Sequence, residues 1–342
     1  MKIAILGWYY QNNAGDDRIL ECLKRKVLSH GITEVEVFVA WDDLSNKLSV
    51  INSCDFLLVG GGGLILRNTN RIAEQLKKIT IPWAFIGVSI DSVGDDNIKF
   101  ITYIAKNAKF ILVRDKFSFT TFKTYRSKDL FLSPDLTFLY PYKPNNTTES
   151  YKATALSLRP WKPNLFKQYT KNYHRFNKLA HKFPFIIDVL GLWNIKRFSK
   201  RVKTYVKNSI NFLPLHIHTV NGDDALIKHH FNIHKDVSFD INKLKESNYL
   251  IGMRLHSLIF ATQLGVPFIA VSYASKINHY LEDIGLAEYI VDVNNYKSLF
   301  KKIKLLEQRR DDLSKHLLQI SNSYTVEVNS IVDTIFKDYI LC

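Results

Sequence analysis

The chain has 342 residues, of which 46% are hydrophobic, which is enough for a large core and favours two domains. Its formal net charge of +15 suits anionic partners such as nucleic acid, acidic lipid or a phosphorylated substrate. Its three cysteines have no metal-ligand spacing, which argues against a disulfide framework and for a reducing compartment. No apolar run reaches the roughly 18 residues that a membrane span needs, and the first residues predict a β-strand, not a signal peptide.

The first part of the chain alternates between short apolar runs and helical patterns. Strands are predicted at residues 2–7, 34–40, 55–59, 83–88, 109–113 and 130–132. Helices are predicted at 18–29, 71–79, 96–106 and 116–125, the last with Asp115 as its N-cap. This alternation indicates a doubly wound parallel sheet.

The second part repeats the alternation after a linker. Residues 140–150 are rich in proline and polar residues, which is typical of an interdomain linker. Strands are predicted at 154–158, 210–218, 249–251, 268–271 and 289–293, with a helical C-terminal region from 296. We therefore expect an α/β protein with two Rossmann-like doubly wound parallel-sheet domains, 1–145 and 151–325, facing a cleft. A terminal helix, 326–342, is expected to pack back on the first domain.

The loop after the first strand contains Asn13, Gly15 and Asp16. A polar loop between a strand and a helix can hold a ligand at the helix N-terminus. The dinucleotide fingerprint G-x-G-x-x-G is absent. Asp16 or Asp17 could equally cap the helix, so ligand contact and capping both remain open.

Four consecutive glycines, 60–63, directly follow the third predicted strand. They allow positive φ or a close approach of backbone to ligand, and no Gly-Lys-Ser/Thr follows that would make a Walker loop. A structural turn and a ligand cradle are both possible, and the position at a sheet edge favours the cradle for Gly61 and Gly62.

Cationic residues gather at the predicted strand ends of the second domain. Arg254 and His256 follow the strand at 249–251, and Lys276 follows the next strand. Parallel sheets bind ligands at this edge, and helix N-termini favour anions. Alone, each would be a surface charge. Together they favour a ligand site, to which Arg159 adds a further anion ligand or a further surface charge.

Residues 163–208 form a basic insertion. Between Pro160 and Ile210 there are twelve lysines and arginines and one acidic residue, Asp188 (12 − 1 = +11). A helix predicted at 196–207 carries an apolar stripe of Phe198, Val202, Tyr205 and Val206. It is either a helix that lies on an anionic membrane or an ordinary helix with its stripe in the core.

His216 and His218 alternate on a predicted strand. This resembles a metal pair only weakly because no third ligand lies near in sequence, so core or edge histidines are favoured and no metal site is expected.

Several short motifs occur in a fixed order along the chain. They are Asn13-Ala14-Gly15-Asp16, the glycines 60–63, Val113-Arg114-Asp115 with Ser118, Pro134-Asp135, Leu156-Ser157-Leu158-Arg159, and Arg254-x-His256 with a lysine 20 residues later (276 − 256 = 20). Together they resemble the polysaccharide pyruvyl transferase family over most of the chain, apart from about 161–208. The resemblance implies a GT-B fold.

The resemblance also implies a reaction. The donor is phosphoenolpyruvate, the product is a pyruvate ketal on two hydroxyls of a sugar, and phosphate is released. Arg254, Lys276, Arg159 and Arg114 are expected to bind the donor anions, although Arg114 could instead position its own turn. His256 is the expected general acid/base.

The remaining site residues are expected on the acceptor side. Asp16 would bind or deprotonate a sugar hydroxyl, with Asn13, Gly15, Gly61, Gly62 and Asp223 near the acceptor. No cofactor is expected beyond phosphoenolpyruvate as donor substrate.

The expected acceptor is a saccharide of a capsule, exopolysaccharide or cell wall, or its lipid-linked precursor. The expected location is the cytoplasm, at the inner face of an anionic membrane, without nucleic acid. Two alternatives stay open: a GT-B glycosyltransferase that uses a nucleotide sugar, and a non-catalytic basic scaffold on the membrane surface.

Overall fold

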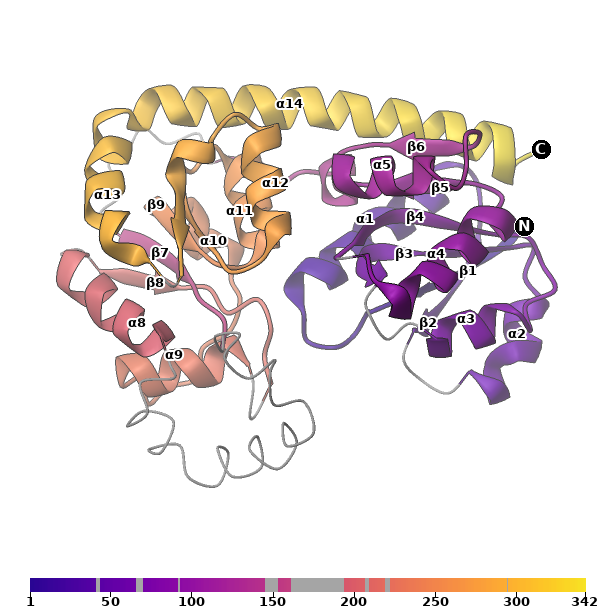
Figure 1. Ribbon diagram of the computed structural model, residues 1–342, viewed down its shortest axis with the longest axis horizontal. Helices are drawn as coiled ribbons and strands as arrows, with labels where there is room; N and C mark the ends of the chain where they lie inside the picture. The colour runs from indigo at the N-terminus through magenta and orange to yellow at the C-terminus, as the bar shows by residue number, and fades with distance from the viewer. Residues whose placement is uncertain are drawn as a thin grey trace. The chain divides into compact units, whose positions relative to one another are not determined.

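The computed structural model describes residues 1–40, 44–65, 70–91, 93–144, 153–160, 194–206, 209–218, 222–293 and 295–342. They form two compact units: Met1–Pro141 with Gln319–Cys342, and Tyr142–Leu318 (Figure 1). Most of the predicted basic insertion, from 161 to 193, and part of the predicted linker lie outside the described residues.

The first unit is built on a six-stranded parallel sheet in the order β2-β1-β3-β4-β5-β6. Its strands are β1 (Lys2–Gly7), β2 (Glu34–Val39), β3 (Phe56–Ile65), β4 (Trp83–Ile90), β5 (Ile111–Val113) and β6 (Leu130–Leu132). The chain moves from β1 to β2 on one side and then to β3 on the other, so the direction of winding reverses between β1 and β3.

Helices cover both faces of this sheet. They are α1 (Ala14–Ser29), α2 (Leu48–Asn52), α3 (Asn70–Leu76), α4 (Asp95–Asn107) and α5 (Lys116–Lys123). Side chains of α2 to α5, among them Ile51, Ile72 and Ile101, pack with alternate strand residues in one core. Because side chains alternate along a strand, the intervening residues face the opposite side, where α1 contacts β3.

The C-terminal segment completes the first unit. Helix α14 (Arg310–Ile335) continues as a short π-helix, Phe336–Ile340. Phe336 stacks on His30 with ring centroids 4.6 Å apart, Lys26 forms an ion pair with Asp333 at 2.7 Å, and Tyr339 contacts Phe110 at 5.4 Å between centroids. The end of the chain is therefore part of the core beside α1.

The second unit contains a five-stranded parallel sheet in the order β11-β10-β9-β7-β8. Its strands are β7 (Ala153–Ser157), β8 (Ile210–Phe212), β9 (Ser247–Gly252), β10 (Phe268–Ser272) and β11 (Ile290–Asp292). Its helices are α8 (Asn194–Tyr205), α9 (Asp223–Phe231), α10 (Ile241–Lys245), α11 (Leu255–Leu264), α12 (Ser275–Asp283) and α13 (Leu299–Gln308). Every residue of α11 from His256 to Leu264 is buried, as expected for a helix that is apolar on all sides.

The structure resolves one question about α8. Phe198 and Val202 are fully buried, whereas Lys200, Arg201 and Lys203 are exposed. Phe198, Val202 and Val206 of the apolar stripe thus belong to the core, whereas Tyr205 is half-buried and the cations face solvent. This supports the ordinary-helix interpretation for most of the stripe.

Two predicted strand boundaries are wrong. The third strand does not stop at Val59 but runs through the glycines to Ile65, because Gly60 and Gly62 pair with Ile86 and Val88 of β4. The strand at 210–218 stops at Phe212, so His216 and His218 lie in the connection to α9. Among the described residues, no helix combines the length and the apolar character that a membrane span requires.

Candidate active site

Each sheet reverses its winding between two strands. In the first unit these are β1 and β3, and in the second they are β7 and β9. Open parallel sheets bind ligands at the carboxyl ends of such strands, because the following loops diverge there and leave room. Most predicted site residues follow the ends of these strands or their neighbours, whereas Gly61 and Gly62 lie within β3.

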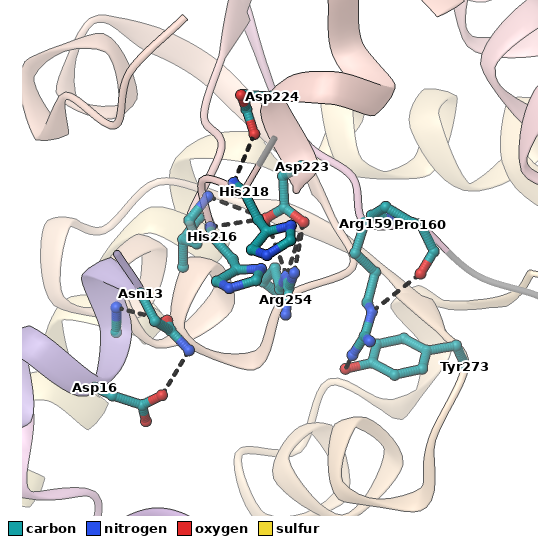
Figure 2. Close-up of polar contacts among 12 residues, drawn as sticks. Asn13, Asp16, Arg159, Pro160, His216, His218, Asp223, Asp224, Arg254 and Tyr273 are labelled. Atoms are coloured by element: carbon teal, nitrogen blue, oxygen red, sulfur yellow. Dashed lines mark hydrogen bonds and ion pairs between the residues drawn. The ribbon is translucent and has the colours of Figure 1, made fainter. Parts of the chain in front are cut away.

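Arg254 is held by a buried carboxylate in the second unit. It follows β9 and is the N-cap residue of α11. Its Nε donates to both carboxylate oxygens of Asp223 at 3.1 and 3.0 Å, and its Nη2 donates to Oδ1 at 2.6 Å (Figure 2). The Asp223 side chain is fully buried and that of Arg254 is 17% exposed, so the carboxylate fixes the guanidinium from the protein side.

Asp223 also organises the chain around it. Its Oδ2 accepts the backbone N–H groups of Leu215 and His216, each at 3.1 Å. Asp223 is therefore a structural anchor for Arg254 and for the connection before α9. The contact with an acceptor that the sequence suggested for Asp223 stays a prediction.

Arg159 reaches across the sheet edge to Tyr273. Arg159 lies two residues beyond β7 and Tyr273 lies one residue beyond β10, with β9 between these strands. Arg159 Nη1 donates to the Tyr273 hydroxyl at 2.6 Å (Figure 2). Its guanidinium carbon also lies 4.5 Å from the centroid of the Tyr273 ring, which is the geometry of a cation–π contact.

The pKa of Tyr273 is lowered by the positive charges at this edge of the second sheet. Burial would raise the pKa of its hydroxyl, but the positive charges of Arg159, Lys276 and Arg254 outweigh burial and lower that pKa below its ordinary value. Three of the four cations predicted to bind the donor thus act on one phenol. Lys276 itself lies in the first turn of α12.

His256 occupies the first turn of α11. It is 9% exposed, and its ring is roughly parallel to that of Phe260, with centroids 6.0 Å apart. Phe260 also contacts Phe239 and Tyr142. The imidazole of His256, which is two residues after Arg254, therefore packs on a cluster of aromatic rings.

His216 and His218 form a stacked pair next to Arg254. Their ring centroids are 6.0 Å apart. Burial and then the charge of Arg254 lower the pKa of His216, so its imidazole favours the neutral form near pH 7. Within the described part of the chain no group of three or more His, Cys, Asp or Glu side chains could hold a metal ion.

In the first unit, Asn13 is the N-cap of α1, so the capping alternative left open for Asp16 and Asp17 does not apply. The Asn13 carbonyl oxygen accepts from the Gly15 N–H at 3.2 Å, and its amide donates to Asp16 at 2.5 Å (Figure 2). Asp17 instead accepts from the N–H of Tyr10 at 2.7 Å. The Asn13 side chain therefore both caps the helix and orients the Asp16 carboxylate through its amide N–H.

The glycine run packs against this carboxylate. Gly61 and Gly62 have φ of +82° and +79°, and a Cβ on Gly62 would lie 2.6 Å from Asp16 Oδ1. The Tyr9 hydroxyl donates to the carbonyl of Gly60, and burial together with the Asp16 charge raises its pKa. Positive φ and the lack of room for a Cβ therefore favour glycine at both positions, and the backbone of Gly62 lies against the Asp16 carboxylate.

Arg114 has an interior partner. Its Nη1 pairs with Asp135 at 2.7 Å, with both side chains buried, and its Nη2 donates to Ser89 at 3.1 Å. Asp115 caps α5 by accepting from the Ser118 N–H at 2.8 Å, as predicted. Arg114 thus stabilises the ends of β4 and β5, and its donor contact stays a prediction.

Sequence reasoning missed Tyr273 and the role of Asp223 as the anchor of Arg254. A signal for Tyr273 was present, because it directly follows an apolar strand and precedes Lys276 by three residues. No local pattern pairs Asp223 with Arg254, which are separated by 31 residues.

Two parallel-sheet units of this kind are typical of the GT-B fold, and comparison with solved structures supports this class. S. aureus MnaA in complex with UDP has a TM-score of 0.56 at 11% identity, with 100% of this chain and 98% of that chain covered. An α-glucosyltransferase in complex with UDP-glucose and DNA scores 0.52 at 13% identity (98% and 99%). UDP-GlcNAc 2-epimerase from Neisseria meningitidis, bound to UDP-GlcNAc, scores 0.51 at 14% identity (99% and 100%). At these identities the likeness concerns the fold, which is of the GT-B type.

The family follows from the sequence model that the chain matches. The model of polysaccharide pyruvyl transferases matches residues 13–275, which include nearly all the motifs above. The chain belongs to this family and is a transferase. No curated protein sequence matches it significantly.

Proposed function

We propose that this protein transfers the enolpyruvyl group of phosphoenolpyruvate to two hydroxyls of a sugar in a cell-surface polysaccharide or its lipid-linked precursor. The product would be a pyruvate ketal, and phosphate would be released. The observation that supports this best is that Arg159, Arg254 and Lys276 follow neighbouring strand ends of one sheet, where Arg159 bonds the Tyr273 hydroxyl and all three charges lower its pKa.

Three cations at one edge of the second sheet suit a small molecule with two anionic groups. Phosphoenolpyruvate carries a phosphate and a carboxylate, and a guanidinium can give two parallel hydrogen bonds to either. We assign Arg159, Arg254 and Lys276 to these anions. Arg114 is left out, because Asp135 and Ser89 engage its guanidinium.

The chemistry needs one proton on carbon and two hydroxyls that lose theirs. His256 would protonate the methylene carbon, and the neighbouring carbon would become electrophilic. A sugar hydroxyl attacks that carbon, the bond to the phosphate oxygen breaks, and the second hydroxyl closes the ring. Of the two hydroxyl protons, one replaces the proton given to the methyl group and the other leaves with the phosphate, so the atoms balance without a redox step.

We propose that the acceptor binds at the residues around α1 in the first unit. Asp16 would accept a hydrogen bond from a sugar hydroxyl or remove its proton, and Asn13 would hold the carboxylate in place. Glycines 61 and 62 would let a sugar ring approach the backbone.

A lipid-linked acceptor would place the protein at an anionic membrane, and one surface suits that contact. Arg201 donates to the Tyr205 hydroxyl at 3.3 Å, the rings of Tyr205 and Phe300 lie 5.0 Å apart, and Lys304 lies 4.6 Å from the Phe300 ring centroid. We call these four residues, on α8 and α13, the basic aromatic stripe. Cations with exposed aromatic rings favour anionic interfaces.

Ligand-dependent stability separates this proposal from its main rival. A glycosyltransferase that uses a nucleotide sugar is the alternative, because the similar solved structures contain UDP or UDP-sugars. We expect phosphoenolpyruvate to raise the melting temperature in a concentration-dependent way and UDP-glucose to leave it unchanged. The opposite pattern would favour the glycosyltransferase, and no response to either would favour a scaffold.

A further inference from the structure

The hydroxyl of Tyr273 accepts a hydrogen bond but has no acceptor for its own proton among the described residues. Its hydroxyl accepts the 2.6 Å hydrogen bond from Arg159, which leaves its own proton to be donated. Within the described part of the chain, the bond from Arg159 is the one hydrogen bond that this hydroxyl makes. The charged groups that act on the phenol are Arg159, Lys276 and Arg254, and guanidinium and ammonium groups have no acceptor.

The position of Tyr273 at the sheet edge also favours contact with a ligand. The contact with Arg159 passes over the end of β9, where Arg254 begins α11. The phenol therefore lies at the same sheet edge as the side chains that bind the donor in the proposed function. An oxygen that accepts a hydrogen bond from this phenol would lie beside Arg159 and in the field of Lys276 and Arg254, whose charges act on the phenol, which fits an anionic oxygen.

We propose that Tyr273 is a donor-binding residue: its hydroxyl orients Arg159 and donates a hydrogen bond to a phosphate oxygen of phosphoenolpyruvate. The inference rests on the proposed function, because it names a further residue of the same site. The phosphate is the better acceptor because it carries up to two negative charges near neutral pH, whereas the carboxylate carries one. The lowered pKa of the phenol makes it a stronger hydrogen-bond donor than an ordinary tyrosine.

Tyr273→Phe tests this directly, since it keeps the ring under Arg159 and removes the hydroxyl. By isothermal titration calorimetry we expect about tenfold weaker binding of phosphoenolpyruvate, the typical effect of losing one charge-assisted hydrogen bond. Inorganic phosphate should lose affinity in the same way, and pyruvate, which has no phosphate, should not. Tyr280→Phe is the matched control, because its hydroxyl bonds Thr262 at 2.7 Å, and it should bind as wild type does.

The pH dependence gives a readout that a purely structural role would not affect. When the phenol ionises at alkaline pH, it loses its donor and its charge repels phosphate, so wild-type affinity should fall. Tyr273→Phe should lack this step. Every other ionisable group is present in both proteins, so the difference between the two profiles isolates Tyr273.

A second variant, Arg159→Lys, tests the orienting role and serves if Tyr273→Phe does not fold. It keeps the charge but loses the fork that contacts both the hydroxyl and the ring. We expect weaker binding, and a smaller further loss from Tyr273→Phe in this background than in wild type. Wild-type affinity in Arg159→Lys would overturn the orienting role.

The outcomes distinguish this inference from the function it extends. Equal phosphate affinity of wild type and Tyr273→Phe overturns the inference and leaves the proposed function standing. Wild-type binding of phosphoenolpyruvate without ketal formation overturns the proposed function and leaves the inference about phosphate binding standing. A wild-type protein that binds neither phosphoenolpyruvate nor phosphate overturns both.

Discussion

Single side chains decide where the cations of the second unit point. The three hydrogen bonds from Arg254 to the fully buried Asp223 fix one guanidinium, and the Tyr273 hydroxyl fixes another, that of Arg159. Anion recognition depends on such preorganisation, because a guanidinium already oriented loses less freedom when the ligand binds. The partners of the cations therefore matter as much as the cations.

Replacing Asp223 should affect both stability and donor binding. Asp223→Asn removes the charge that pairs with Arg254, and breaking a buried ion pair typically costs about 3 kcal/mol. We expect a lower free energy of unfolding in urea titration and a higher KM for phosphoenolpyruvate. Asp224→Asn is the control, since Asp224 accepts only the His218 N–H, at 3.2 Å, in the contacts described. Equal behaviour of the two variants would contradict the anchoring role.

His216 should make the protein sensitive to acid. Its pKa in the folded state is lowered from 6.5, so the unfolded chain binds a proton more readily as pH falls through about 6.5, and stability is lost in that direction. We expect the melting temperature of wild type to fall more than that of His216→Gln between pH 7.5 and about 5.5. Parallel curves for the two proteins would contradict the lowered pKa.

The sequence allowed prediction of the charged residues but not of their partners. Arg254, Lys276 and Arg159 were placed at one sheet edge because each follows an apolar run, and strand ends of a parallel sheet share an edge. The pairing of Arg114 with Asp135 and of Arg254 with Asp223 joins residues far apart in the chain. It depends on strand order, which local patterns do not specify.

At the scale of elements, strand β3 continues through the glycines at 60–63, beyond the point where a strand normally ends. The sequence pattern stopped at Val59 because glycine is disfavoured in strands, yet β3 pairs with β4 as far as Ile65. Gly61 and Gly62 have positive φ just before the register shift between Gly62 and Ile65, and Gly62 lies against Asp16. Tertiary pairing here overrides local propensity.

Gly62→Ala should therefore disturb Asp16 specifically. Gly31 provides the matched control, because its φ is +78° but no atom lies within 4 Å of the position that a Cβ would occupy there. Both alanines should cost about 1 kcal/mol for the left-handed backbone. Gly62→Ala should in addition raise the acceptor KM, because the methyl group displaces the carboxylate. An unchanged acceptor KM would argue against Asp16 as an acceptor residue.

The basic aromatic stripe makes a prediction about membranes. Arg201→Glu with Lys304→Glu should reduce binding to phosphatidylserine vesicles in a sedimentation assay by at least about thirtyfold, since each cation near such a surface contributes about 1 kcal/mol and two are lost. Lys99→Glu with Lys106→Glu, on exposed positions of α4, changes the charge equally and should have a smaller effect. If both pairs weaken binding alike, only net charge is involved.

On the scale of the whole molecule, one chain builds two units of the same kind. Each has a parallel sheet that reverses its winding beside its first strand, and the C-terminal helix contributes its last part to the first unit. The alternation of strands and helices predicted this architecture from sequence, because each element has a clear apolar period. A return of the terminal helix to the first unit is expected from the sequence, but its contacts, such as Phe336 with His30, are not, because no local pattern pairs residues so far apart.

The central claim is that a cationic sheet edge and one histidine transfer pyruvate from phosphoenolpyruvate to a sugar. The most direct measurement is mass spectrometry of saccharides, including lipid-linked ones, incubated with phosphoenolpyruvate and the protein. We predict the mass increase of a pyruvate ketal with wild type and with His234→Ala, an exposed histidine of the same unit, and its loss with His256→Ala. Ketal formation that survives His256→Ala at the wild-type rate would contradict the account.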